Sequence, residues 1–347
     1  MDPEINPASM RSALIVKPSS LGDVIHTLPA VDCLHRSFSH LSIDWLVNTE
    51  WAPLLEGNPG LRQVIPLPRR QWRGWRDLFK AKRWASETLA PLRPDLVLDF
   101  QGLLRSALLA KSAHGETMVG FRNSREGARW FYDRAIEVPG WRHTHAVDRY
   151  LRLVGAIGVE VPEADSISFP LPEGDPVALT HSGPFLLLHP FSRGRGKSMN
   201  FREVSSLCGR LRETQVVLVG AGVTWPSDLP FPENAENLLG ATTLPQLIWL
   251  MRRARFILSV DSGPMHLAAA ITARLLSLHT WTDPLMVGPW RQDAWVWRDG
   301  FLGKVAGIAP GQFPEQRHRR GEFDPGILPG PVVELIAEFL AEQMNEA

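Results

Sequence analysis

The sequence contains little cysteine, no excess of either charge and no long apolar run. Only two cysteines occur in 347 residues, Cys33 and Cys208, far apart and in unlike surroundings. They exclude a disulfide framework and a cysteine-based zinc site, and they suit a reducing compartment such as the cytosol. Lysine plus arginine equals aspartate plus glutamate, at 37 residues each. No overall charge therefore favours nucleic acid or a membrane, so any such preference must come from local clusters.

The sequence also shows no pattern typical of a membrane-spanning segment or of a signal peptide, so we expect neither. No apolar stretch approaches the roughly 18 residues that a spanning helix needs. The N-terminal stretch MDPEINPASMR is polar and contains two prolines, without the apolar core of a signal peptide. We expect residues 1–11 to form a flexible extension.

Short apolar runs alternate with helical patterns along the chain. SALIVK at 12–17, SIDWLV at 42–47 and DLVLDF at 95–100 predict buried strands. A stretch rich in proline, glycine and serine at 162–184 interrupts this pattern, which restarts with FLLLH at 185–189. Such alternation is typical of α/β domains whose parallel sheets are covered on both faces.

The length and the interrupted pattern together predict two Rossmann-like domains. We expect an N-terminal domain at 12–170, a linker at 171–184 and a C-terminal domain at 185–329, with a helical segment at 330–347. Open α/β sheets bind ligands at the carboxyl ends of their strands. The residues that follow the predicted strands are therefore the candidates for a functional site.

The stretch KPSSLGDVIH follows the first predicted strand and leads into a helix that we expect to begin near Asp23. The small residues Ser19, Ser20 and Gly22 would let a ligand approach the backbone amides at the helix N-terminus. Asp23 itself has two interpretations, a helix N-cap or a catalytic base. The local chemistry alone favours the cap, because aspartate is a preferred N-cap residue.

The stretch SVDSGPMHLAAA places a second loop between a strand and a helix. Free amides at Ser262 and Gly263 could cradle a diphosphate, whereas His266 would lie in the first helical turn. Asp261 beside a phosphate would be repulsive, so it is interpreted as orienting a ribose hydroxyl or holding the loop. The alternative is an ordinary capped helix with a surface histidine.

Two further stretches are basic. LHPFSRGRGKSMNF, at 188–201, combines glycines with Arg193, Arg195 and Lys197, which indicates an anion-binding loop or a solvated basic loop. RRQWRGWRDLFKAKRWASE, at 69–87, interleaves cations with aromatic residues. That pattern suits nucleic acid, an anionic membrane or a phosphorylated glycolipid, and its tryptophans argue against a merely solvated face.

Four stretches in this order resemble one protein family. LIVKPSSLGDVIHTLPA, DFQGLLRSALLA at 99–110, SVDSGPMHLAAA and HTWTDPLMVGP at 279–289 are similar to motifs of the ADP-heptose:lipopolysaccharide heptosyltransferases, glycosyltransferase family nine. The basic-aromatic stretch most closely resembles the enzymes that add the first heptose. The resemblance extends over most of residues 12–290.

This resemblance implies a GT-B fold with two Rossmann-like domains facing a central cleft. The acceptor would bind the first domain and the nucleotide sugar the second, with the segment 330–347 packing back on the N-terminal domain. The implied reaction is inverting transfer of L-glycero-D-manno-heptose from ADP-heptose to a Kdo residue of the lipopolysaccharide inner core. No cofactor or essential metal is expected, and no nucleic acid. The protein would work in the cytoplasm, with the 69–84 stretch contacting the inner face of the cytoplasmic membrane.

The resemblance also assigns roles to individual residues. Asp23 matches the catalytic base, and Lys197 matches the lysine that neutralises the leaving ADP. The expected nucleotide-sugar site comprises Ser192, Asp261, Ser262, Gly263 and His266. The expected acceptor site comprises Ser19, Ser20, Gly22, Arg69, Arg70, Arg73, Arg76, Gln101 and Arg105.

The sequence departs from the family pattern mainly on the donor side. Met199 stands where the family often has tryptophan. The stretch AGVTWPSD directly after Gly220 contains no glutamate, although it ends in Asp228. Alternatives are therefore a family member that uses another nucleotide sugar or a protein acceptor, a GT-B nucleotide-sugar epimerase, and a non-enzymatic anion-binding protein. The stretch 310–326 suggests no role.

Overall fold

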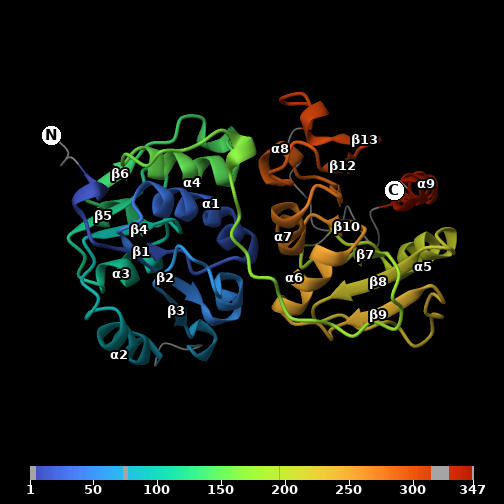
Figure 1. The fold of residues 1–347 in the computed structure, drawn as a ribbon, viewed down its shortest axis with the longest axis horizontal. Coiled ribbons are helices and arrows are strands. Elements are labelled where there is room, and N and C mark those ends of the chain that lie inside the picture. Colours follow the sequence, from blue (N-terminus) through green and yellow to red (C-terminus); the bar gives the residue numbers. More distant parts are fainter. Residues whose placement is uncertain (1–4, 73–76, 195, 314–327, 346–347) are drawn as a thin grey trace. The chain divides into compact units, whose positions relative to one another are not determined.

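The computed structural model describes residues 5–72, 77–194, 196–313 and 328–345. The chain divides into two compact units, Met1–Pro172 and Glu173–Ala347, which we call the N-terminal and C-terminal units. The division falls inside the segment 171–184, where a linker was expected. Figure 1 shows that each unit is a sheet with helices on both faces.

The N-terminal unit contains a parallel sheet with the strand order β3-β2-β1-β4-β5-β6. Its strands are β1 (Ser12–Val16), β2 (Ser42–Asn48), β3 (Gln63–Leu67), β4 (Leu96–Asp99), β5 (Thr117–Phe121) and β6 (Arg134–Ile136). Its α-helices are α1 (Leu21–Ser37), α2 (Asp77–Thr88), α3 (Leu104–Lys111) and α4 (Ala146–Gly155). The central strands are nearly all buried, as expected for a sheet covered on both faces.

Alternate side chains of the central strands point to opposite helical layers. Leu14 and Val16 of β1 share a core cluster with Ala85 of α2 and Ala107 of α3. Helices α1 and α4 contact each other, and Figure 1 shows them on the other face of the sheet. Because successive side chains of a strand point to opposite faces of the sheet, β1 packs against a helical layer on each face.

The C-terminal unit contains a sheet with the order β13-β12-β11-β10-β7-β8-β9, parallel except for the β12–β13 pair. Its strands are β7 (Phe185–His189), β8 (Gln215–Gly220), β9 (Ala235–Leu239), β10 (Phe256–Val260), β11 (Leu275–Leu278), β12 (Trp295–Arg298) and β13 (Phe301–Lys304). Its α-helices are α5 (Phe201–Arg210), α6 (Leu244–Arg253), α7 (Gly263–Ile271), α8 (Pro284–Val287) and α9 (Gly330–Asn345). The predicted α/β class is thus confirmed in both units.

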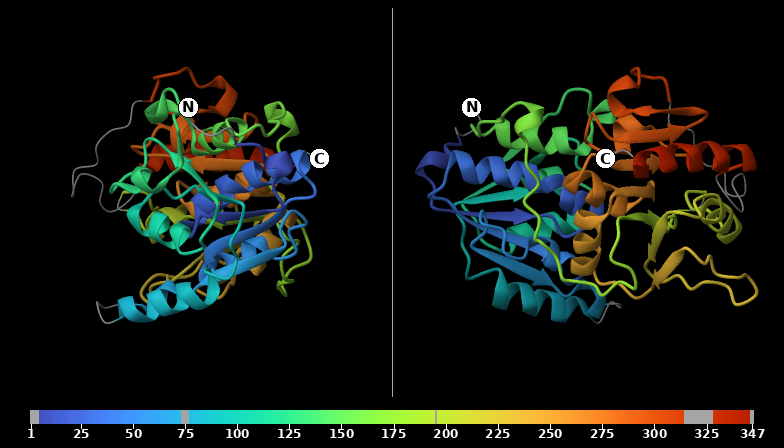
Figure 2. Two further views of the ribbon diagram at one scale, coloured as in Figure 1. Left: turned by 90° about the vertical axis from the view of Figure 1, so that its left-hand side faces the viewer. Right: turned by 45° about the vertical axis from the view of Figure 1, so that its right-hand side comes forward.

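The last helix, α9, packs against the C-terminal unit. Its apolar face joins that unit's core, and the Phe339 ring lies 5.8 Å from the Phe256 ring and 4.8 Å from the Trp295 ring. Figures 1 and 2 show α9 beside α5, where Arg210 pairs with Glu334 at 2.9 Å. The expectation that this segment packs back on the N-terminal domain is therefore wrong. Helical spacing predicts an apolar stripe but does not specify the surface that covers it.

The expected flexible extension is packed where it is described. Ile5 and Pro7 are buried, and the backbone N–H of Arg11 donates to Asp95 at 2.6 Å. The expectation of a loose segment therefore fails for residues 5–11, because two buried side chains and a backbone hydrogen bond hold a segment of otherwise polar composition. No helix within the described ranges is long and apolar enough to cross a membrane.

The packing of α9 predicts a stability difference between two positions on the same helix. Phe339→Ala should lower the stability of the protein by about 3–5 kcal/mol, because it leaves a cavity between α9 and the sheet. Leu335 is 40 % exposed, so Leu335→Ala is the matched control and should have a much smaller effect. Thermal and urea unfolding would measure both variants. Equal losses would contradict the packing of α9 described above.

Candidate functional site

Asp23 lies in the first turn of α1, at the carboxyl edge of β1. The helix begins at Leu21, so Ser20 is the N-cap and Asp23 is the third helical residue. The Asp23 Oδ2 atom accepts hydrogen bonds from the backbone N–H of Ser20 at 3.0 Å and from its hydroxyl at 2.7 Å. Asp23 is therefore a capping-box residue and not the N-cap that the sequence suggested.

The other carboxylate oxygen of Asp23 faces a buried pair that the sequence analysis did not identify. Tyr150 of α4 donates its hydroxyl proton to Asp23 Oδ1 at 3.2 Å, and Lys17 Nζ lies 3.6 Å from the same oxygen. Lys17 also donates to the Tyr150 hydroxyl at 2.9 Å and to the carbonyl of Phe100 at 3.1 Å. The Lys17 side chain is 3 % exposed and that of Asp23 41 %, so the carboxylate is the accessible end of a buried network.

These contacts fix the charges in the network. Burial alone would raise the pKa of Asp23, but Lys17 and the hydrogen bonds from Ser20 and Tyr150 outweigh burial and lower it. Burial alone would lower the pKa of Lys17, but Tyr150 and Asp23 raise it overall. At neutral pH Asp23 is therefore an anion and Lys17 a cation. An ionised, accessible carboxylate can accept a proton from a hydroxyl group.

A second buried carboxylate, Asp99 at the end of β4, organises the neighbouring loop. Its oxygens accept hydrogen bonds from the backbone N–H groups of Gln101 and Gly102 and from the hydroxyls of Ser106 and Tyr132. Burial raises the pKa of Asp99. The side-chain oxygen of Gln101 then accepts from the backbone N–H of Ser19 at 3.2 Å. The loops after β1 and β4 are thereby joined, which brings the predicted residues Ser19, Ser20, Gly22 and Gln101 to one edge of the sheet.

The predicted cationic acceptor residues are less closely grouped. Arg69 and Arg70 lie in a short 3₁₀ helix, Arg69–Gln71, and Arg70 pairs with Glu50 at 3.4 Å. Arg105 is exposed on α3. Arg73 and Arg76 lie outside the described residues, so the structure gives them no position.

The tryptophans of the basic-aromatic stretch are core-packed where they are described. The rings of Trp72 and Trp84 meet edge to face at 5.6 Å and lie against the core of the N-terminal unit. Packing against the core thus accounts for these two tryptophans without a ligand. The spacing of these tryptophans in the sequence does not distinguish packing within the fold from contact with a ligand.

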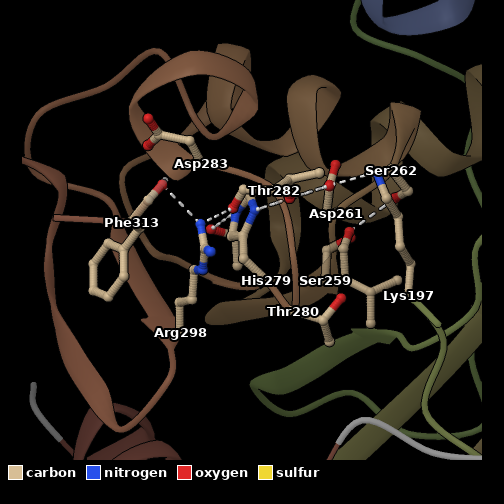
Figure 3. Close-up of polar contacts among 12 residues, drawn as sticks. Lys197, Ser259, Asp261, Ser262, His279, Thr280, Thr282, Asp283, Arg298 and Phe313 are labelled. Carbon is tan, nitrogen blue, oxygen red and sulfur yellow. Dashed lines mark hydrogen bonds and ion pairs between the residues drawn. The ribbon is translucent and has the colours of Figure 1, made fainter. Parts of the chain in front are cut away.

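The C-terminal unit gathers Lys197, Asp261 and Thr282 at the carboxyl ends of three adjacent strands, β7, β10 and β11 (Figure 3). Lys197 Nζ donates to Asp261 Oδ2 at 2.6 Å, and the Thr282 hydroxyl donates to the same oxygen at 2.7 Å. The ammonium group also lies 4.7 Å from the centre of the Trp281 ring. Asp261 therefore holds two loops together, one of the two roles that the sequence analysis left open.

A histidine continues this network into the core. Thr282 uses its only hydroxyl proton on Asp261, so it accepts from His279 Nδ1, 3.1 Å away. His279 Nε2 lies 3.2 Å from the hydroxyl oxygen of Ser277, and that hydroxyl also donates to the carbonyl of Trp295 at 3.3 Å. Burial lowers the pKa of His279 to about 4, which matches this neutral, Nδ1-protonated form. Because His279 is neutral at pH 7, Lys197 is the cation that balances Asp261, whose pKa is lowered even though burial opposes that shift.

The loop that carries Lys197 is braced on both sides. The Ser192 hydroxyl accepts from the backbone N–H of Gly194 at 3.2 Å, and the Ser198 hydroxyl donates to the Ser192 carbonyl at 3.1 Å. Thr280 donates to the carbonyl of Gly196 at 2.8 Å. Arg195 lies outside the described residues. Hydrogen bonds before and after residue 195 thus hold the segments that carry Ser192 and Lys197.

The N-terminus of α7 completes this edge of the sheet. Ser262 is its N-cap, Gly263 its first residue and His266 a half-buried residue of its first turn. The Ser262 hydroxyl donates to the carbonyl of Val260 at 3.0 Å. The first amides of a helix have no partner within the helix and carry partial positive charge. This edge therefore presents Lys197 and a helix N-terminus, both suited to an anion.

Arg298 supports the Thr282 loop from below. Its side chain is fully buried, and Nη1 donates to the carbonyls of Thr282 at 2.7 Å and of Phe313 at 3.0 Å (Figure 3).

Met199, at the position where the family often has tryptophan, is buried in the core of the C-terminal unit. Asp228 lies in an exposed loop. Neither occupies the cluster around Asp261.

Four functional candidates were missed by sequence reasoning: Lys17, Tyr150, His279 and Thr282. Lys17 had a usable signal, a lysine directly after a buried strand, and His279 and Thr282 lie inside the motif HTWTDP. Tyr150 had none, since its partner Asp23 is 127 residues away. Within the described ranges, no group of three histidine, cysteine, aspartate or glutamate side chains could hold a metal ion.

Comparison with known proteins places these features in a family. The model of glycosyltransferase family 9 (heptosyltransferase) matches residues 86–301, more than half of the chain. Lipopolysaccharide heptosyltransferase 1 of Pseudomonas aeruginosa is 31% identical over 310 residues, covering 79% of this chain and 80% of that protein. The Escherichia coli K12 protein of the same name is 30% identical over 311 residues, covering 82% and 92%.

A solved structure agrees with the fold. E. coli heptosyltransferase WaaC with ADP superposes with a TM-score of 0.71 at 23% identity, covering 96% of this chain and 99% of that chain. The expected GT-B fold, with its two Rossmann-like units, is thereby confirmed. The chain belongs to glycosyltransferase family 9, the heptosyltransferase family, and is a glycosyltransferase.

Proposed function

We propose that this enzyme transfers L-glycero-D-manno-heptose from ADP-heptose to a Kdo hydroxyl of the lipopolysaccharide inner core, with inversion. Its relatives are named lipopolysaccharide heptosyltransferase 1, and a structural neighbour binds ADP. The observation that carries the proposal is Asp23, an ionised and accessible carboxylate held by Lys17, Tyr150 and Ser20. Such a group is suited to activate a hydroxyl nucleophile.

The proposed reaction is a single displacement at the anomeric carbon. The acceptor hydroxyl gives its proton to Asp23 while its oxygen forms a bond to the anomeric carbon of the heptose. The bond from that carbon to the diphosphate oxygen breaks, and ADP leaves with the bonding electron pair. Attack on the face opposite the leaving group inverts the configuration of the anomeric carbon.

The donor side must stabilise the charge that develops on ADP. Lys197 has three N–H donors, of which Asp261 receives one, so the same ammonium group can also contact a diphosphate. The N-terminus of α7, with Ser262 and Gly263, provides further positive potential. Ser192 and His266 complete the proposed nucleotide-sugar site. These groups would act without an essential metal or cofactor.

The acceptor side is proposed to bind a charged lipid-linked sugar. Ser19, Ser20, Gly22 and Gln101 would line the sugar site, and Arg69, Arg70 and Arg105 would attract its carboxylates and phosphates. Arg73 and Arg76 are assigned to the same role on the sequence alone. We further propose that the 69–84 stretch contacts the inner face of the cytoplasmic membrane. No role in nucleic-acid binding is proposed.

The departures on the donor side favour a second candidate, a family 9 enzyme that uses another nucleotide sugar. The decisive experiment offers the purified enzyme ADP-heptose and competing nucleotide sugars, with Kdo-lipid A and a protein as acceptors. Transfer from ADP-heptose to Kdo, with an inverted linkage in the product's NMR spectrum, supports the proposal. Turnover of a different donor only, or isomerisation without an acceptor, would replace it.

Asp23→Asn tests the proposed base. We expect turnover to fall by about 10²–10⁴-fold, because the amide cannot accept the proton, while donor affinity stays nearly unchanged. Steady-state kinetics and isothermal calorimetry with ADP would measure both. Glu203→Gln is the matched control, since Glu203 holds the equivalent capping-box position of α5. If both variants lost only stability, near ~1 kcal/mol, Asp23 would be a capping residue alone.

Tyr150→Phe tests whether the Tyr150 hydroxyl keeps the pKa of Asp23 low. Removing the Tyr150 donor should raise the pKa of Asp23, so the acidic limb of the pH–rate profile should move to higher pH. Lys17 and Arg149 are the remaining positive groups that act on Asp23. The chain has only two tyrosines, and the other, Tyr132, donates to the buried Asp99. Tyr132→Phe should lower the stability of the protein and leave the acidic limb of the pH–rate profile unchanged. Identical pH–rate profiles for the two variants would count against the network of Lys17, Tyr150 and Asp23.

Lys197→Met tests the donor side. We expect kcat to fall by about 10²–10³-fold, since the charge that stabilises the leaving diphosphate is lost. Lys304→Met is the control. Like Lys197, Lys304 lies over a tryptophan ring, that of Trp295, but Lys304 is on β13 and not in the loop that carries Lys197. Rapid-quench measurement of the chemical step would separate the loss from slower product release. An unchanged chemical step would show that Lys197 only holds the loop through Asp261.

A further inference from the structure

Three large apolar side chains are exposed together on α3 and on the adjoining 3₁₀ helix Ala128–Phe131. Leu104 is 38 %, Leu108 50 % and Trp130 77 % exposed. The two helices contact each other. The backbone N–H of Leu104 also donates to the carboxylate of Glu126 at 3.3 Å, just before the second helix. We call this the α3–Trp130 surface, and contiguous apolar exposure of this kind marks an interaction site.

The underside of this surface is firmly packed. Ser106, Ala107 and Ala110 on the opposite side of α3 are buried, as is Ala128 at the start of the 3₁₀ helix. The backbone N–H of Arg125 donates to the carbonyl of Gly102 at 2.8 Å, which ties the two segments together. The small buried residues thus fix the larger apolar ones facing outward.

The charges around the surface are mostly positive. Within 104–111 and 125–130 there are four cations and one carboxylate, Glu126. The cations are Arg105, Lys111, Arg125 and Arg129, all exposed. The Arg129 guanidinium lies 4.5 Å from the centre of the Trp130 ring. Apolar side chains bordered by cations complement an anionic lipid surface, with acyl chains beneath charged headgroups.

We propose that the α3–Trp130 surface docks on an anionic membrane, with Trp130, Leu104 and Leu108 entering the headgroup region. Tryptophan prefers this interface because its ring is amphipathic. This inference rests on the proposed function, whose membrane contact it extends beyond residues 69–84. Helix α2, with exposed Phe79, packs on the same core cluster and so covers the same face of the sheet.

The position of this surface suits a lipid-linked acceptor. Leu104 begins α3 directly after the loop in which Gln101 contacts Ser19. The surface therefore starts at the edge of the sheet that carries Asp23. An acceptor sugar that projects from the membrane would reach this edge without its lipid leaving the bilayer.

Vesicle sedimentation of the full-length protein tests the proposal. The wild type should bind vesicles rich in phosphatidylglycerol more tightly than vesicles of phosphatidylcholine alone, and high salt should weaken this binding. Trp130→Ser and Leu108→Ser should each weaken binding by about three- to tenfold at either salt concentration, since each removes partly buried apolar area. Leu335→Ser, at a 40 % exposed position on α9, is the control for Leu108→Ser and should bind like the wild type.

Several outcomes would overturn the proposal. They are unchanged binding in both Trp130→Ser and Leu108→Ser, an equal loss in Leu335→Ser, or no preference of the wild type for anionic vesicles. A dimer that dissociates in Trp130→Ser would identify a second copy as the occupant instead. Vesicle binding needs no turnover, so an enzyme that binds as expected but fails to use ADP-heptose would contradict only the proposed function. Transfer to a soluble, deacylated acceptor should be unaffected in the docking variants.

Discussion

Parallel strand pairing is the constraint on which both units depend. In a parallel sheet the carboxyl ends of neighbouring strands meet at one edge, whatever their separation in the sequence. In the N-terminal unit this edge joins the loops after β1 and β4, through Gln101 and Ser19. In the C-terminal unit it joins the loops after β7, β10 and β11, through Lys197, Asp261 and Thr282. Each cluster is a consequence of strand order.

The two clusters share a physical design, a buried charge that positions a more accessible one. In the N-terminal unit the buried cation Lys17 and the phenol of Tyr150 hold the carboxylate of Asp23. In the C-terminal unit the signs are reversed, because the buried carboxylate of Asp261 holds the ammonium group of Lys197. Buried charges need partners of this kind, since an unpaired one would be strongly destabilising. Pairing with the buried charge therefore fixes the position of the more accessible group, which is Asp23 in the N-terminal unit and Lys197 in the C-terminal unit.

Neutral polar groups complete both clusters. The hydrogen-bonded chain from Ser277 through His279 and Thr282 ends on Asp261, with the imidazole kept uncharged by burial. Asp99 plays the corresponding part in the N-terminal unit, where four donors surround it. These interior contacts set the shape of the loops that carry the candidate residues. A substitution in this layer would therefore change the site without touching any ligand.

The sequence by itself determined the α/β class, the two-unit organisation and the loops that bear Asp23, Lys197 and Asp261. Apolar runs, helical spacing and small residues after strands are local patterns, and local patterns are readable from one chain. The tertiary structure decided which partners those residues meet. The contact of Tyr150 with Asp23 and the packing of α9 on its own unit depend on segments that are distant in the sequence, and the contact of Trp72 with Trp84 depends on how one stretch folds against the core. Packing and burial select such contacts, and neither is encoded in the spacing of the residues involved.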